Sequence, residues 1–123
     1  MNIYYKLNEN NEVVSCGMYE HIDFMASSHR LQVGLNKIKG LKVSTVFLGV
    51  DCGSSTKEPL VFETAIFYPN ETKIKKRYTT WKEALEGHRY YCKQLLEGKE
   101  YEEELSSEGF LAVLKALTSE NDS

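Results

Sequence analysis

Phe47, Glu63 and Arg77 are an aromatic ring, a carboxylate and a guanidinium that fall on three successive predicted strands of this chain. An aromatic ring can stack on a base, and a guanidinium binds a phosphate through two parallel hydrogen bonds. A carboxylate accepts hydrogen bonds from ribose hydroxyls or from an exocyclic amine. If the three side chains converge, they form a candidate nucleotide-binding site.

The strands that must bring these side chains together are predicted over residues 43–50, 60–68 and 74–79. The first is rich in Val, Thr and Phe, and residues 51–59 after it contain the Gly, Ser, Thr and Pro that are typical of loops. Lysines along the third strand indicate an exposed edge, where charge discourages pairing with other chains. We therefore expect the three strands to form the centre of an antiparallel sheet.

The register between these strands decides whether the three side chains share a face, because side chains alternate along a strand. With each connection centred on its middle residue, Phe47 lies opposite Glu63, and Arg77 lies diagonal to Glu63. Val46 and Leu48 then point into the core, and the three candidate side chains lie on the other face. A slip of one residue would invert the contribution of the second strand.

A second interpretation of the same residues involves no ligand. Glu63 and Arg77 would form a cross-strand ion pair, and Phe47 would fill an interface between two copies of the chain. Alternation alone favours this interpretation, because cross-strand ion pairs are common on sheets.

The segments before the first of these strands predict a hairpin and a helix. Residues 3–14 place β-branched and aromatic residues on both sides of a turn-forming cluster, which indicates an opening hairpin. Apolar residues then recur at helical spacing over residues 19–35, with a possible break at Ser27 and Ser28. Residues 37–42 are expected to connect this helix to the sheet.

The strongest predicted helix begins at Thr80. Thr80 and Glu83 form a capping box, in which each side chain satisfies a backbone amide at the helix start, and Gly98 supplies the stop. The apolar stripe expected to face the sheet consists of Trp81, Ala84, Leu85, His88, Cys92 and Leu95. On this stripe His88 is interpreted as a core or interface residue rather than a catalytic base.

The C-terminal part predicts one more helix and a disordered tail. The acidic run over residues 100–104 is typical of a solvated segment, and residues 119–123 are expected to be disordered. The apolar face of the last helix would consist of Phe110, Val113, Leu114 and Leu117. Residues 1–118 are therefore predicted to form a single α+β domain, an antiparallel β-sheet with helices packed on one face.

Charge and composition narrow the possible partners. The formal net charge is −3, so the chain lacks the positive field that dominates binding to duplex nucleic acid. Cations gathered in one pocket would still bind a small anion, and the available contacts are Arg30, Lys57, Arg77 and Arg89. No apolar run could span a membrane and no secretory signal is recognised, which favours the cytoplasm.

The cysteines and histidines indicate neither a metal site nor a catalytic centre. Cys16, Cys52 and Cys92 are widely spaced, so we expect reduced thiols. His21 and His29 lack the spacing that places two imidazoles on one helical face, so no metal site is predicted.

Three blocks follow one another in the middle of the chain: VSTVFLGVD at 43–51, PLVFETAIF at 59–67 and RYTTWKEALEGH at 77–88. In this order they resemble a family of small phage proteins, the Thoeris anti-defence proteins of the first type. The resemblance covers residues 43–88, somewhat over a third of the chain. Where family members tend to carry His just after the aspartate, this chain has Cys52.

The resemblance implies a sponge that acts in the host cytoplasm and is not an enzyme. Such proteins bind a cyclic ADP-ribose-type signalling nucleotide (gcADPR) made by bacterial TIR-domain immunity proteins, and hold it without cleavage and without a cofactor. The resemblance also implies a homo-oligomer built from dimers, with a hexamer expected, and a further capacity for cyclic oligonucleotides. The alternative is a phage protein that inhibits a host protein by direct binding.

The resemblance assigns ligand-site or interface roles only at matched positions. These positions are Phe47, Asp51, Glu63, Arg77, Tyr78 and His88. Arg30 and Lys57 complete the predicted ligand-binding set as possible anion contacts.

Overall fold

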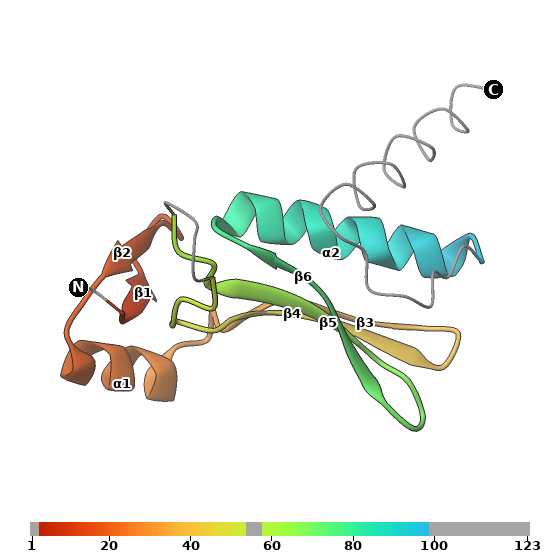
Figure 1. The fold of residues 1–123 in the computed structure, drawn as a ribbon, viewed down its shortest axis with the longest axis horizontal. Helices are drawn as coiled ribbons and strands as arrows, with labels where there is room; N and C mark the ends of the chain where they lie inside the picture. The colour runs from red at the N-terminus through yellow and green to blue at the C-terminus, as the bar shows by residue number, and fades with distance from the viewer. Residues whose placement is uncertain (1–2, 54–57, 99–123) are drawn as a thin grey trace.

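The computed structural model describes residues 3–53 and 58–98 and shows an α+β fold (Figure 1). A four-stranded antiparallel sheet carries the long helix α2 (Trp81–Leu96) on one face. A two-stranded sheet and the short helix α1 (Met18–Ser27) lie together at one end of the larger sheet (Figure 1). The predicted fold class is confirmed, whereas the predicted last helix and the tail at 119–123 fall outside the described residues.

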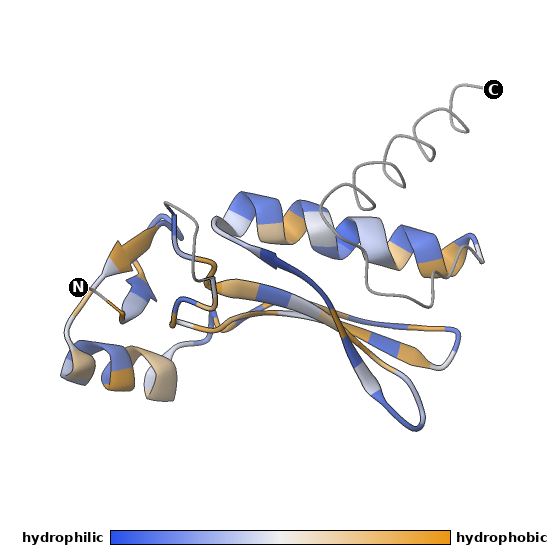
Figure 2. Ribbon diagram, in the orientation of Figure 1, coloured by the Kyte–Doolittle hydropathy of each residue, from blue (hydrophilic) through white to orange (hydrophobic). Residues whose placement is uncertain are grey.

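The larger sheet is a meander in which strands adjacent in sequence are also adjacent in space. Its order is β3 (Gln32–Ile38), β4 (Leu41–Phe47), β5 (Phe62–Phe67) and β6 (Thr72–Tyr78). Figure 2 shows β5 as mostly hydrophobic and β6 as mostly hydrophilic, as suits a central strand beside an edge strand. The prediction that the lysine-rich strand lies at an edge is confirmed.

The opening hairpin is also confirmed, as β1 (Tyr5–Leu7) paired with β2 (Val13–Ser15). It is attached to the larger sheet through the backbone, because the amide of Tyr5 donates to the carbonyl of Gly49 at 2.9 Å. Gly49 has a φ of +74°, which a residue with a side chain rarely adopts, and the described strand β4 ends two residues before it.

The predicted helix over residues 19–35 is wrong in its second half. Helix α1 ends at Ser27, where Ser28 turns to an extended conformation and its amide donates to the Phe24 carbonyl. The chain then forms β3, which pairs with β4 from Gln32 onward. Pairing along β4 satisfies the backbone of this segment, and a helix containing Gly34 would be destabilised by about 1 kcal/mol relative to alanine at that position.

Helix α2 begins and ends as predicted. The Thr80 hydroxyl accepts from the Glu83 amide at 3.1 Å, and Gly98 follows the last turn with a φ of +71°. The carboxylate of Glu83 accepts from the amide and hydroxyl of Thr79 at 3.2 and 2.6 Å, so it holds the residue before the cap. The Thr79 hydroxyl lowers the pKa of the Glu83 carboxyl by stabilising its charged form.

The predicted register is wrong by one residue between β4 and β5, and by two residues between β5 and β6, where Arg77 lies opposite Glu63 rather than diagonal to it. Phe47 lies opposite Phe62, and Glu63 lies opposite Val46 on one side and Arg77 on the other. Phe47 therefore points toward the α2 side of the sheet, and Val46 points away from it. This register buries the largest apolar side chains, because Phe47 and Phe62 are 2% and 0% exposed, with ring centroids 5.1 Å apart.

The side chains between the sheet and α2 form two apolar clusters. One contains Leu7, Phe47, Val61, Phe62, Tyr78 and Ala84, and the other contains Ile38, Val43, Ile66, Tyr90, Tyr91 and Leu95. The predicted stripe of α2 therefore holds for Ala84, His88 and Leu95, which are buried, and for Trp81 and Cys92, which pack partly buried against the two clusters. It missed the two buried tyrosines.

Candidate functional site

Phe47 does not converge with Glu63 and Arg77. Phe47 is buried on the α2 side, whereas Glu63 and Arg77 form a cross-strand pair on the opposite face, with Arg77 Nε 3.1 Å from Glu63 Oε2. The predicted juxtaposition of ring, guanidinium and carboxylate is therefore wrong, as a consequence of the one-residue shift in register. The cross-strand ion pair of the second interpretation is present.

Asp51 and Arg30, two other predicted residues, make hydrogen bonds to neighbouring loops. The Asp51 carboxylate accepts from the amides of Gly53 and Leu60 at 2.9 and 3.0 Å, which closes the loop between β4 and β5 at its base. The Arg30 guanidinium lies 5.6 Å from the Phe24 ring centroid and donates to the Asn11 side chain at 2.9 Å. Lys57 lies outside the described residues.

The last two predicted residues, Tyr78 and His88, belong to one buried hydrogen-bonded chain. The Tyr78 hydroxyl is 3.0 Å from the hydroxyl of Thr64, which is 2.6 Å from the hydroxyl of Thr45. Thr45 is 2.8 Å from His88 Nδ1, and His88 Nε2 is 2.7 Å from Asn36 Oδ1. We call these five residues the polar chain, and it runs between the two apolar clusters.

One set of proton positions satisfies the whole polar chain. If His88 Nε2 donates to the Asn36 carbonyl oxygen, then Nδ1 accepts from Thr45. Thr45 in turn accepts from Thr64, and Thr64 accepts from the Tyr78 hydroxyl. Burial lowers the pKa of the His88 imidazole and raises the pKa of the Tyr78 hydroxyl, so both groups stay neutral.

The polar chain makes stability depend on pH through His88. Its pKa is depressed below the usual value of 6.5 in the folded state, so the unfolded chain binds the proton first as the pH falls. We expect unfolding free energy to decrease from about pH 7 to about pH 5, and His88→Gln to remove part of that decrease. Urea denaturation at the two pH values measures it.

The control for this prediction is His29→Gln, which changes an exposed histidine. This variant should keep the pH dependence of the unmodified chain. An identical pH dependence in His88→Gln and the unmodified chain would contradict the role assigned to His88.

Two glycines make room for the polar chain. A Cβ at Gly34 in β3 would lie 2.6 Å from the His88 ring, and a Cβ at Gly87 in α2 would overlap the hydroxyl of Tyr78. A side chain at either position would displace a member of the polar chain. The close approach of α2 to the sheet therefore depends on both glycines.

A groove of about 460 Å³ runs between β6 and α2 beside this polar chain. Its volume is within the range of small-molecule sites. It is lined by Leu60, Lys76, Arg77, Tyr78, Thr79, Glu83, Glu86, Gly87 and Tyr90, which we call the β6–α2 groove. Two predicted residues, Arg77 and Tyr78, are among them.

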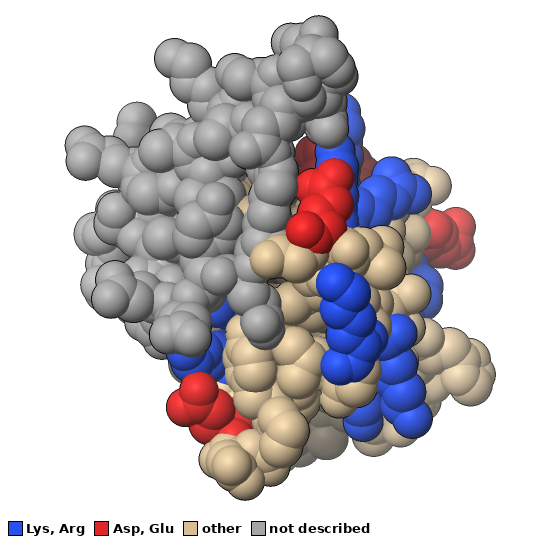
Figure 3. Space-filling view, turned by 90° about the vertical axis from the view of Figure 1, so that its right-hand side faces the viewer, with Lys and Arg blue, Asp and Glu red and all other residues tan. Residues whose placement is uncertain are grey.

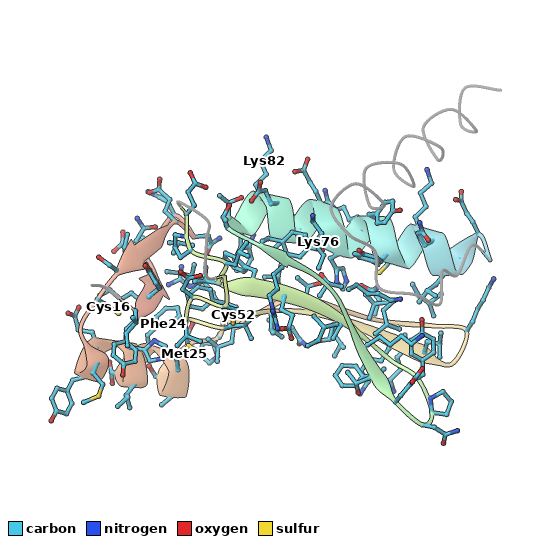
Figure 4. All side chains as sticks on the ribbon, in the orientation of Figure 1. Cys16, Phe24, Met25, Cys52, Lys76 and Lys82 are labelled. Atoms are coloured by element: carbon cyan, nitrogen blue, oxygen red, sulfur yellow. The ribbon has the colours of Figure 1, made fainter. Side chains whose placement is uncertain are left out.

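The β6–α2 groove combines cations, rings and carboxylates. Figure 4 shows Lys76 between β6 and α2, whereas the Arg77 guanidinium is paired with Glu63 on the opposite face of the sheet. The rings of Tyr78 and Tyr90 are 5% and 8% exposed, so little of either ring remains open to solvent. A lysine beside aromatic rings and a carboxylate acceptor, Glu86, can bind an anion that also carries hydroxyl groups.

Among the groove residues to which we assign a binding role, the sequence did not predict Lys76, Glu86 and Tyr90. Lys76 was recognisable, because it lies two residues from Tyr78 and must share its side of the strand. Glu86 and Tyr90 follow from the way α2 lies along β6, which the sequence pattern does not determine.

The three cysteines are free thiols, as predicted. Burial raises the pKa of the Cys16 and Cys92 thiols, which therefore remain protonated and weakly nucleophilic. Cys16 lies near α1 (Figure 4), and the Cys52 amide donates to the carbonyl of Leu60, a residue that lines the groove. None of the cysteines lines the groove within the residues that the structure describes.

The comparisons with known proteins returned no match to this chain among protein-family models, curated proteins or solved structures. Neither described helix has the length and apolar character needed to cross a membrane.

Proposed function

We propose that this protein is a phage anti-defence sponge that sequesters a cyclic ADP-ribose-type nucleotide without cleaving it, in the cytoplasm of the infected host. The observation that carries the proposal is the β6–α2 groove, which brings Lys76 together with two tyrosines and Glu86. The resemblance of residues 43–88 to the Thoeris anti-defence proteins names the ligand class. TIR-domain immunity proteins would supply the ligand.

The groove and this class of ligand are chemically complementary. A cyclic ADP-ribose isomer has two phosphates, which require cations, and ribose hydroxyls, which require acceptors such as a carboxylate. Lys76 supplies the cation on the α2 side of β6, and Glu86 supplies the acceptor. Glu83 already accepts from Thr79, so we assign it to the structure of the helix start.

A sponge needs tight binding and slow release, and it needs no stabilisation of a transition state. The groove fits this requirement, because its two tyrosine rings are held by α2 and by the polar chain before any ligand arrives. A preorganised site loses less conformational entropy when the ligand binds.

Isothermal calorimetry with cyclic ADP-ribose isomers tests the proposed function. We expect stoichiometric binding of at least one isomer, and recovery of the intact nucleotide after the protein is denatured. Absence of heat with every isomer, or recovery of a cleaved product, would contradict the proposal.

Lys76→Ala tests whether the groove is the site. Loss of a charge-assisted contact to phosphate should weaken binding about tenfold or more, which corresponds to about 1.4 kcal/mol. Lys82→Ala is the matched control, since Lys82 projects from the start of α2 away from the sheet (Figure 4). If Lys82→Ala weakens binding and Lys76→Ala does not, the ligand lies instead in the neighbouring hollow of about 770 Å³ that Lys82 lines with Trp81.

A second candidate function is inhibition of a host protein by direct binding. The face of the sheet opposite α2 exposes Leu35, Phe67 and Ile74, with 46%, 41% and 39% of their surface accessible. Apolar side chains grouped on an open face favour a protein partner. Capture of a host protein that Phe67→Asp abolishes and Lys76→Ala leaves intact would support this function over the first.

We also propose that the protein is a homo-oligomer built from dimers, as the resemblance implies, with a hexamer expected. Light scattering of the full chain would measure the number of copies. A monomer at every concentration tested would contradict this assembly.

A further inference from the structure

A hollow of about 620 Å³ lies beyond the C-terminal end of α2, at the opposite end of the helix from Trp81. Its floor is apolar and consists of Leu41, Tyr68 and Leu95. Leu95 belongs to the second apolar cluster, and Leu41 and Tyr68 pack against that cluster. The hollow is therefore a place where the core reaches the surface without a covering element in the described part of the chain.

The rim of this hollow carries two lysines from different hairpins. Lys39 lies in the turn between β3 and β4, with Nζ 3.9 Å from the position that a Cβ would take at Gly98. Lys73 lies on β6, 3.6 Å from Glu71 and with Nζ 5.6 Å from the centroid of the Tyr68 ring. Figure 3 shows several Lys and Arg side chains on this end of the molecule.

The sequence that follows Gly98 is complementary to this hollow in both charge and hydropathy. Its first residues include four glutamates, at positions 100, 102, 103 and 104. Farther on, apolar residues recur at helical spacing, namely Phe110, Val113, Leu114 and Leu117. An acidic run next to the lysine rim is thus followed by an apolar stripe that needs a surface to bury it.

We propose that the hollow is the docking site of this chain's own C-terminal segment, residues 99–117. The glutamates would lie near Lys39 and Lys73, and the apolar stripe would cover Leu41, Tyr68 and Leu95. Gly98 itself lines the hollow, and the residues from Gly98 to Phe110 span about 18 Å as a helix or up to about 40 Å when extended. Because a short tether gives a local concentration in the millimolar range, the segment outcompetes a separate partner of similar sequence.

Leu114→Asp in the full chain tests this docking, with Ala112→Asp as the matched control. Residue 112 would lie on the opposite side of a helix from the stripe, so the same charge there should leave docking intact. We expect Leu114→Asp to speed amide hydrogen exchange at residues 39–41 and 68–73 at least tenfold, and to shift the NMR signals of the Leu41 methyls. Ala112→Asp should change neither.

Two outcomes would overturn the proposal. One is unchanged exchange and unchanged Leu41 signals in Leu114→Asp, which would mean that the stripe does not cover the hollow. The other is protection of the hollow that disappears on dilution of the unmodified chain, which would mean that a second copy occupies it.

Discussion

Phe47→Ala is expected to lower the free energy of unfolding by about 3–5 kcal/mol, the usual cost of removing a buried phenylalanine. Phe47 is 2% exposed, and its ring lies 5.1 Å from the Phe62 ring and 5.9 Å from the Phe24 ring. It therefore joins α1 to the core of the larger sheet. Urea denaturation followed by circular dichroism measures the change.

Phe67→Ala is the matched control for this prediction. It is the same substitution on the neighbouring strand β5, but Phe67 is 41% exposed on the open face. We expect Phe67→Ala to lower the free energy of unfolding by less than about 1 kcal/mol, since an exposed side chain buries little apolar surface on folding. Equal losses in the two variants would contradict the observed register. A fully stable Phe47→Ala chain that no longer binds nucleotide would restore the ligand role predicted from the sequence.

Thr64→Val has the second largest expected effect, a loss of about 2–3 kcal/mol in unfolding free energy. Valine has nearly the same shape as threonine, so packing is preserved and the hydrogen bonds alone are removed. Thr64 is fully buried in the middle of the polar chain, 2.6 Å from Thr45 and 3.0 Å from the Tyr78 hydroxyl. The substitution leaves the Tyr78 hydroxyl as a buried donor without an acceptor.

Thr72→Val on β6 is the control, because Thr72 is an exposed position at the end of an edge strand. Its effect should stay within about 0.5 kcal/mol of the unmodified chain. A double-mutant cycle of Thr64→Val with Tyr78→Phe provides a further check. If the polar chain is formed, Thr64→Val should cost less in the Tyr78→Phe background than in the unmodified chain.

The parts of the fold that the sequence predicted are those specified by local chemistry. The capping threonine Thr80 and the stop at Gly98 bound α2 as expected, because caps act within one turn of helix. The lysines of β6 indicated an edge strand for a similarly local reason, since charge disfavours further pairing.

The missed strand β3 shows where local pattern fails. Its apolar residues Val33 and Leu35 are two positions apart, which is too short a pattern to separate from the preceding helix, and pairing with β4 makes the extended conformation more stable. The register depends on contacts between segments in the same way. Turn length is compatible with two registers, and burial of Phe47 against Phe62 selects the one that was not predicted.

The candidate site shows the same division between local and tertiary information. Arg77 and Tyr78 were predicted, and they lie side by side on β6. Lys76, Glu86 and Tyr90 join them only because α2 crosses the sheet beside β6, supported by the fit of Gly87 over Tyr78. The sequence alone can identify candidate site residues on a strand. Which helix lies across the groove from that strand depends on tertiary packing.

The most direct test of the proposed function is a crystal structure of the full chain soaked with the cyclic ADP-ribose isomer that binds in calorimetry. The account predicts an intact nucleotide in the β6–α2 groove, with a phosphate within hydrogen-bonding distance of Lys76. A nucleotide bound beside Trp81 and Lys82, or on the open face of the sheet, would contradict this assignment of the site.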